Sequence, residues 1–271
     1  MTKNNFLKRA FIVAEHIKNK QFSPYTLQSK LERGGSYSDF FICRPDLYSN
    51  VYIAENIFAL LLDQQFPVNN LFTFYNAQGQ IFHETRLKAS DPFLHFSIPC
   101  LDTLDEYVSF THHVNIDGSL LTSLQAEVTA IISQSRGIQH RGYVLYKFDN
   151  SSIGSLVHGN FGGIKYNSQR LQASAKQRRE EYEFTSSYIY SHNNKYHLVF
   201  NNPTEKTLSI DVIGGLDNSP IKKVTLNSFG TQCVEISQYN GPITTISKLP
   251  ICRPIVFKNP YRTGSFDVFH A

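Results

Sequence analysis

The sequence predicts a mainly β protein of one or two antiparallel β-sandwich units, jelly-roll or immunoglobulin-like, with an N-terminal helical element and a central helix. Short strand-like runs recur with turn-forming residues about every 8–12 positions, as sandwiches require. Phe (21) and Tyr (15), which favour pleated surfaces, are frequent among the 271 residues. An AT-rich genome would enrich them equally, so the strand pattern carries more of the argument than the composition.

Residues 1–35 are expected to form the helical element. Apolar residues recur at helical spacing from Phe6 to Ile17, with Lys and Arg on the other face. Ser23-Pro24 is typical of a second helix start, and Gly34-Gly35 would end that helix. A docking helix pair is the expected role.

Residues 36–139 are expected to form a first β-rich unit. Asn76-Ala77-Gln78-Gly79 separates two strand-like runs and predicts a hairpin, because Asn and Gly tolerate the backbone angles of a tight turn. The segment Tyr52–Leu62 fits either a long strand or a short helix. An apolar stripe predicts a helix over 117–136, although the β-branched residues Val128–Ile132 leave a strand as the alternative.

Residues 140–271 are expected to form a second β-sandwich unit. Gly142–Phe148 is expected to pair with Ile153–His158 across a polar four-residue turn, and further short strands follow to the end of the chain. Phe266–Phe269 alternates like a strand and is expected to pair within a sheet or with a partner.

Composition and motifs exclude several function classes. The formal net charge of +4 is spread over the chain, so no nucleic-acid partner is expected. No window approaches the roughly 18 apolar residues of a membrane span, and no secretory signal is recognisable. The four cysteines form no CxxC pair, which indicates buried thiols in a soluble cytoplasmic protein. No GxSxG, Walker-A, HExxH, GxGxxG or HxH pattern occurs, so no metal ligands are assigned and the cofactor is unknown.

Leu156–Ile164 is the most unusual stretch, because Gly159 and Gly162 interrupt a strand-like run that also carries His158 and Asn160. Glycine inside a strand pattern predicts a bulge or a close approach of another backbone or a ligand. The structural alternative is a bulged turn in which His158 is buried and makes its hydrogen bonds within the protein.

His140 and Arg141 begin the preceding strand, so the predicted hairpin would place them near His158. A His, an Arg and an Asn converging there would suit a carboxylate, a phosphate or a sugar hydroxyl. We therefore assign His158 and His140 as candidate catalytic residues, and Asn160, Arg141, Gly159 and Gly162 as candidate ligand-binding residues.

Three hypotheses about function remain. The first is a non-enzymatic binding or assembly protein for a carbohydrate or another polar small ligand, because Tyr, Asn, Gln and His serve sugar recognition; the absence of Trp counts against it. The second is an enzyme with a histidine-centred acid–base or metal site acting on a sugar-like or polar substrate. A homo-oligomer or another protein partner, formed through edge strands or helices, is the third expectation.

Overall fold

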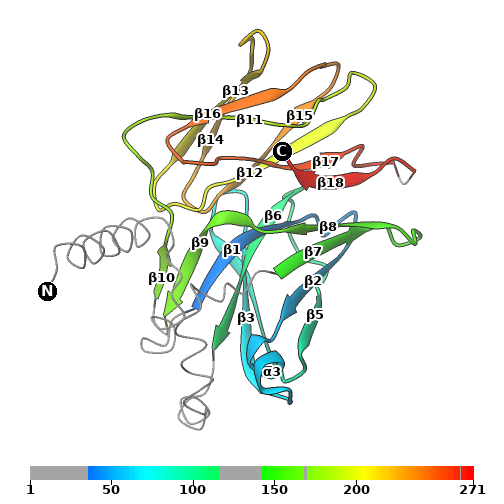
Figure 1. Ribbon diagram of the computed structural model, residues 1–271, viewed down its shortest axis with the longest axis vertical. Coiled ribbons are helices and arrows are strands. Elements are labelled where there is room, and N and C mark those ends of the chain that lie inside the picture. Colours follow the sequence, from blue (N-terminus) through cyan, green and yellow to red (C-terminus); the bar gives the residue numbers. More distant parts are fainter. Residues whose placement is uncertain (1–35, 116–141, 168–169, 263) are drawn as a thin grey trace, which may run out of the picture.

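The computed structural model describes residues 36–115, 142–167, 170–262 and 264–271 (Figure 1). These residues form 18 strands and one short helix, all strand pairs are antiparallel, and the mainly β class is confirmed. The helices expected over 1–35 and 117–136 lie outside the described residues, as do His140 and Arg141.

The strands assemble into four sheets, which we number in Roman numerals. Sheet I has the order β10 (Arg170–Ala173), β9 (Asn160–Asn167), β1 (Ser36–Cys43), β6 (Val108–Asn115), β3 (Val68–Tyr75), β4 (Ile81–Ala89). Sheet II has the order β5 (Phe93–Ser97), β2 (Ser49–Glu55), β7 (Gly142–Lys147), β8 (Gly154–His158).

Two further sheets lie above the first pair in Figure 1. Sheet III has the order β15 (Thr231–Ile236), β12 (Tyr196–Asn201), β17 (Ile255–Lys258), β18 (Asp267–His270). Sheet IV has the order β11 (Tyr182–Thr185), β16 (Ile243–Ser247), β13 (Leu208–Gly214), β14 (Pro220–Leu226).

Sheets I and II pack face to face around an aromatic core. Phe41 and Phe110 of sheet I contact Tyr52 of sheet II, with ring centroids 4.9 and 5.6 Å apart, and all three side chains are buried. Offset and edge-on ring contacts of this kind stabilise a core beyond the area that they bury. The core leaves little room: a Cβ on Gly142 would lie 2.1 Å from the Tyr52 ring.

Sheet III is covered on both faces. Along β12, Val199 faces the core of sheets I and II, whereas Leu198 and Phe200 face a second core shared with sheet IV. Phe257 of β17 also enters the first core, where its ring lies 5.1 Å from that of Tyr146. Because both faces are buried, β12 has no exposed residue, and sheet III joins the two parts of the fold into one packed unit.

The sheets do not divide between residues 139 and 140, where the sequence predicts the boundary between the two β units. Strand β7 pairs with β2, and β9 pairs with β1, so the chain up to Ala173 completes sheets I and II. Antiparallel sheets can pair strands that are far apart in sequence, and the spacing of turns does not reveal such partners.

Several local predictions are confirmed. The Asn76–Gly79 turn joins β3 to β4, with Gly79 at a φ of 81°, and β7 pairs with β8. Tyr52–Leu62 contains both expected elements, because β2 ends at Glu55 and helix α3 (Ile57–Leu62) follows at once. The Asn56 side chain caps α3 by accepting a hydrogen bond from the Ala59 N–H.

Candidate functional site

The glycine-rich stretch forms the predicted bulge. Phe40 pairs with Asn160 and Ser38 with Ile164, so β9 uses more residues than β1 over this interval, which includes Gly162. Gly159 links β8 to β9 where β1 approaches closely: a Cβ there would lie 2.8 Å from Asp39 Cβ. The structure therefore requires glycine at position 159 for packing, whatever its role toward a ligand.

His158 meets another histidine from the last strand of the protein. Its ring centroid lies 4.2 Å from that of His270, whose Nε2 donates a hydrogen bond to the His158 carbonyl at 3.0 Å. The His158 Nδ1 donates to the Gly159 carbonyl at 2.8 Å. Together with the 2.9 Å contact between Ser155 Oγ and Asp267 Oδ1, this pair ties β8 to β18.

The remaining predicted site residues are not brought into one described constellation. Asn160 is buried, and its Oδ1 has no hydrogen-bond partner among the described residues. His140 and Arg141 fall outside those residues. A joint action of His158, His140, Asn160 and Arg141 on a ligand therefore stays a prediction.

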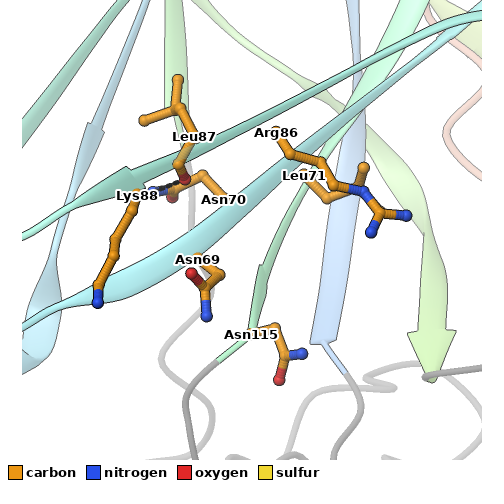
Figure 2. Close-up of a pocket in the computed structure, with 7 residues that line it drawn as sticks. All are labelled: Asn69, Asn70, Leu71, Arg86, Leu87, Lys88 and Asn115. Atoms are coloured by element: carbon orange, nitrogen blue, oxygen red, sulfur yellow. Dashed lines mark hydrogen bonds between the residues drawn. The ribbon is translucent and has the colours of Figure 1, made fainter.

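A polar pocket that the sequence did not reveal lies across β4, β3 and β6. Figure 2 shows its seven lining residues, which enclose about 350 Å³: Asn69, Asn70, Leu71, Arg86, Leu87, Lys88 and Asn115. In the sheet register Asn69 faces Lys88 on one side and Asn115 on the other, so the three form a row across adjacent strands. Such neighbours have Cβ atoms only about 5 Å apart.

The outward-facing groups of this pocket are unsatisfied within the described structure. Asn69, Arg86, Lys88 and Asn115 are exposed, and their side chains make no hydrogen bond or ion pair with any described residue. Asn70 is different, because it is buried and its Oδ1 lies 2.8 Å from His112 Nε2. The pocket thus has one buried wall residue held by a hydrogen bond and four exposed polar groups, two of them cationic.

A second cavity, of about 490 Å³, lies between sheets I and IV. Its lining includes the cationic residues Lys176, Arg178, Arg179, Lys206 and Lys248, together with the carboxylate of Glu205. Lys176 and Arg179 of this lining are exposed. This cavity provides a comparison site for any anion that binds by charge alone.

A third group of polar residues lies where sheet III meets strands β1 and β6. We call it the junction cluster; it consists of Arg44, Glu106, Tyr107, His197, Cys233, Glu235 and Tyr261. Arg44 is buried and contacts Glu106 Oε1 at 2.8 Å, and Tyr261 donates to the same oxygen at 2.9 Å. Tyr107 Oη lies 2.9 Å from His197 Nδ1.

Burial controls the protonation of this cluster. It lowers the pKa of His197, so the imidazole is neutral near pH 7 and its 3.6 Å approaches to Glu106 and Glu235 are polar contacts without a full ion pair. Burial also raises the pKa of the Cys233 thiol to about 12. Unliganded, Cys233 is therefore a thiol and a poor nucleophile.

The missed residues left only weak signals in the sequence. His197 interrupts the mainly apolar strand β12, and Cys233 and Glu235 alternate with the apolar residues Val234 and Ile236 in β15. Their convergence depends on the β12–β15 register, where His197 lies opposite Glu235 and Val199 opposite Cys233. Asn69, Lys88 and Asn115 likewise become neighbours only through the pairing of three strands.

Comparison with protein-family models, curated proteins and solved structures yields no match for this chain. In the described ranges, no helix combines the length and the apolar character needed to cross a bilayer.

Proposed function

We propose that the protein is a cytoplasmic binding protein whose pocket on β4, β3 and β6 takes a negatively charged, hydroxylated small ligand, an acidic saccharide. The observation that carries this proposal is the row of Lys88, Asn69 and Asn115, with Arg86 beside it, all exposed and without partners among the described residues. The four free cysteines agree with a reducing compartment.

The side-chain chemistry matches such a ligand. Each Asn offers two donors and one acceptor oxygen, the combination that a sugar hydroxyl uses, and Arg and Lys supply charge-assisted hydrogen bonds to a carboxylate. None of the seven described lining residues is acidic, so an anion meets no repulsion from the wall itself. The described lining has no Ser, Cys or His and no carboxylate pair, and binding is the activity that these groups support.

The strands hold these groups at defined spacings. Asn69 and Leu71 lie on adjacent strand positions of the same face, and Leu71 is opposite Arg86. The register therefore places the Cα of Arg86 one pleat repeat, about 7 Å, from that of Lys88 in the first row. That spacing suits a monosaccharide ring between the amide row and the Arg86 guanidinium, and Leu71 would contact its apolar face.

The test is a pair of titrations with ligands that differ in one group, glucuronate and glucose, or disaccharides ending in them. Calorimetry should show binding of the uronate at least tenfold tighter than that of the neutral sugar, since a hydrogen bond to a charged group contributes about 1.5–3 kcal/mol. Arg86→Ala and Asn115→Ala should each weaken uronate binding by about tenfold.

Lys248→Ala is the matched control, because it removes one cation from the other cavity and leaves this pocket intact. It should leave the affinity unchanged. Equal binding of the charged and neutral ligands, or loss of binding in Lys248→Ala but not in Arg86→Ala, would contradict the proposal.

A further inference from the structure

We propose that Glu106, His197 and Cys233 of the junction cluster bind a divalent metal ion, with Zn²⁺ the ion that their donor set fits. One donor atom from each residue lies within 4.8 Å of the other two. The three residues come from the segment before β6, from β12 and from β15, so the ion would connect sheet I to sheet III.

The donor types select the metal. A thiolate sulfur, an imidazole nitrogen and a carboxylate oxygen together favour Zn²⁺ over Mg²⁺ or Ca²⁺, which prefer oxygen ligands. Bond lengths of about 2.0–2.3 Å in a tetrahedron place ligand atoms about 3.5 Å apart. Side-chain shifts of about 1 Å would close the present spacing, and a water molecule or Glu235 would complete four-fold coordination.

A second observation points to a ligand at this place. The His197 side chain is only 2% exposed, yet its Nε2 has no hydrogen-bond partner among the described residues. A buried nitrogen without a partner is costly and in native proteins commonly marks a water or an ion. Because His197 Nδ1 already contacts Tyr107 Oη at 2.9 Å, Nε2 is the nitrogen left for the metal, and Glu235 Oε2 lies 3.6 Å from it, where it would serve as the fourth ligand.

The polar groups around the two carboxylates orient them for this geometry. Arg44, Tyr261 and His197 all approach Oε1 of Glu106, which leaves Oε2 of that carboxylate for a metal bond. Lys195 fixes the other carboxylate, with 2.9 Å between its Nζ and Glu235 Oε2. Hydrogen-bonded carboxylates are the usual outer shell of protein zinc sites. On binding, the Cys233 thiol would release its proton to solvent, because the thiolate is the ligand.

The experiment uses the full-length, tag-free chain, stripped of metal with a chelator and titrated with Co²⁺. We expect one Co²⁺ per chain, a thiolate-to-cobalt charge-transfer band, and displacement of the Co²⁺ by Zn²⁺. Cys233→Ser should abolish the band. Glu106→Gln, which preserves side-chain shape, should weaken Zn²⁺ binding at least tenfold and remove the rise in melting temperature that Zn²⁺ produces in the wild type.

Cys100→Ser is the matched control, because Cys100 is an exposed thiol outside the cluster. It should retain the band and the affinity. The proposal is overturned if saturating Co²⁺ produces no band in the wild type, or if the band persists in Cys233→Ser. Loss of the band in Cys100→Ser alone would also overturn it, since the metal would then be bound at the surface.

Discussion

His270 makes the stability of the protein depend on pH. Its Nδ1 is buried without a hydrogen-bond partner in the described structure, and its Nε2 donates to the His158 carbonyl. Burial, with smaller contributions from the charge of Arg253 and from His158, lowers the pKa of His270 to about 3. The ring is therefore neutral in the folded protein throughout the physiological range.

The size of this pH effect on stability follows from the difference between the pKa of His270 in the folded protein and its pKa in the unfolded chain. An unfolded histidine titrates near pH 6.5. Below that pH the unfolded chain binds a proton that the folded protein excludes, so this contribution to stability is complete above about pH 6.5 and is lost as the pH falls toward 3. Between pH 7.5 and pH 5.0 the loss from this one ring is about 2 kcal/mol.

The assay compares the wild type with His270→Gln, whose amide keeps a donor for the His158 carbonyl but cannot titrate. Free energies of unfolding are measured by urea denaturation at pH 7.5 and pH 5.0. The wild type should lose about 2 kcal/mol more than His270→Gln. His192→Gln, at an exposed position, should behave as the wild type does. An equal loss in the wild type and in His270→Gln would refute the reasoning.

Two further predictions concern the cores. Phe257→Ala leaves a cavity at a fully buried site in the core shared by sheets I, II and III. Denaturation should show a loss of about 3–5 kcal/mol in the free energy of unfolding, with unfolding still a single transition. Two separated transitions would show that the sheets unfold independently. Gly142→Ala places a methyl group against the buried Tyr52 ring and should cost about 2 kcal/mol or more, whereas Gly264→Ala, with no atom within 4 Å of the new Cβ, should change stability by less than about 0.5 kcal/mol. Thermal melting that ranks these two glycine variants in the opposite order would contradict this packing.

The sequence predicts the parts of the fold that local chemistry determines. The Asn76–Gly79 turn needs residues that accept unusual backbone angles, and the alternating runs on either side leave one register in which apolar residues share a face. The same reasoning finds the bulge at Asn160–Ile164, because glycines inside a strand seldom serve regular pairing. Each of these inferences uses residues that are close together in the chain.

The long-range arrangement could not be predicted in this way. Nothing in the β7 sequence indicates that it pairs with β2, some ninety residues earlier, as well as with its neighbour β8. Sheet III shows a related difficulty. Leu198 and Val199 are both apolar, which indicates a strand buried on two sides, but not that sheet IV covers one side and the first core the other.

The candidate sites depend on the same missing information. The glycines drew attention to His158, which contacts His270, more than a hundred residues later, and spacing within the chain cannot indicate that contact. The polar pocket is harder to foresee. Asn69, Lys88 and Asn115 are ordinary surface residues when considered singly, and only two strand registers bring them into one row.

The location of the junction cluster also indicates whether its residues stabilise the fold or form a binding site. The ring of Tyr107, a member of the cluster, packs against that of Phe257 with centroids 4.9 Å apart, so apolar contacts already join sheet III to the first core there. A buried Arg44 adds little net stability to such a contact, because the cost of removing its charge from water offsets most of the attraction to Glu106. The network instead fixes the orientation of its side chains, because Arg44 contacts Tyr107, Tyr261 and Glu106 simultaneously. That convergence holds the Glu106 carboxylate and the His197 ring in one orientation, which is the condition that a binding site requires and a packing contact does not.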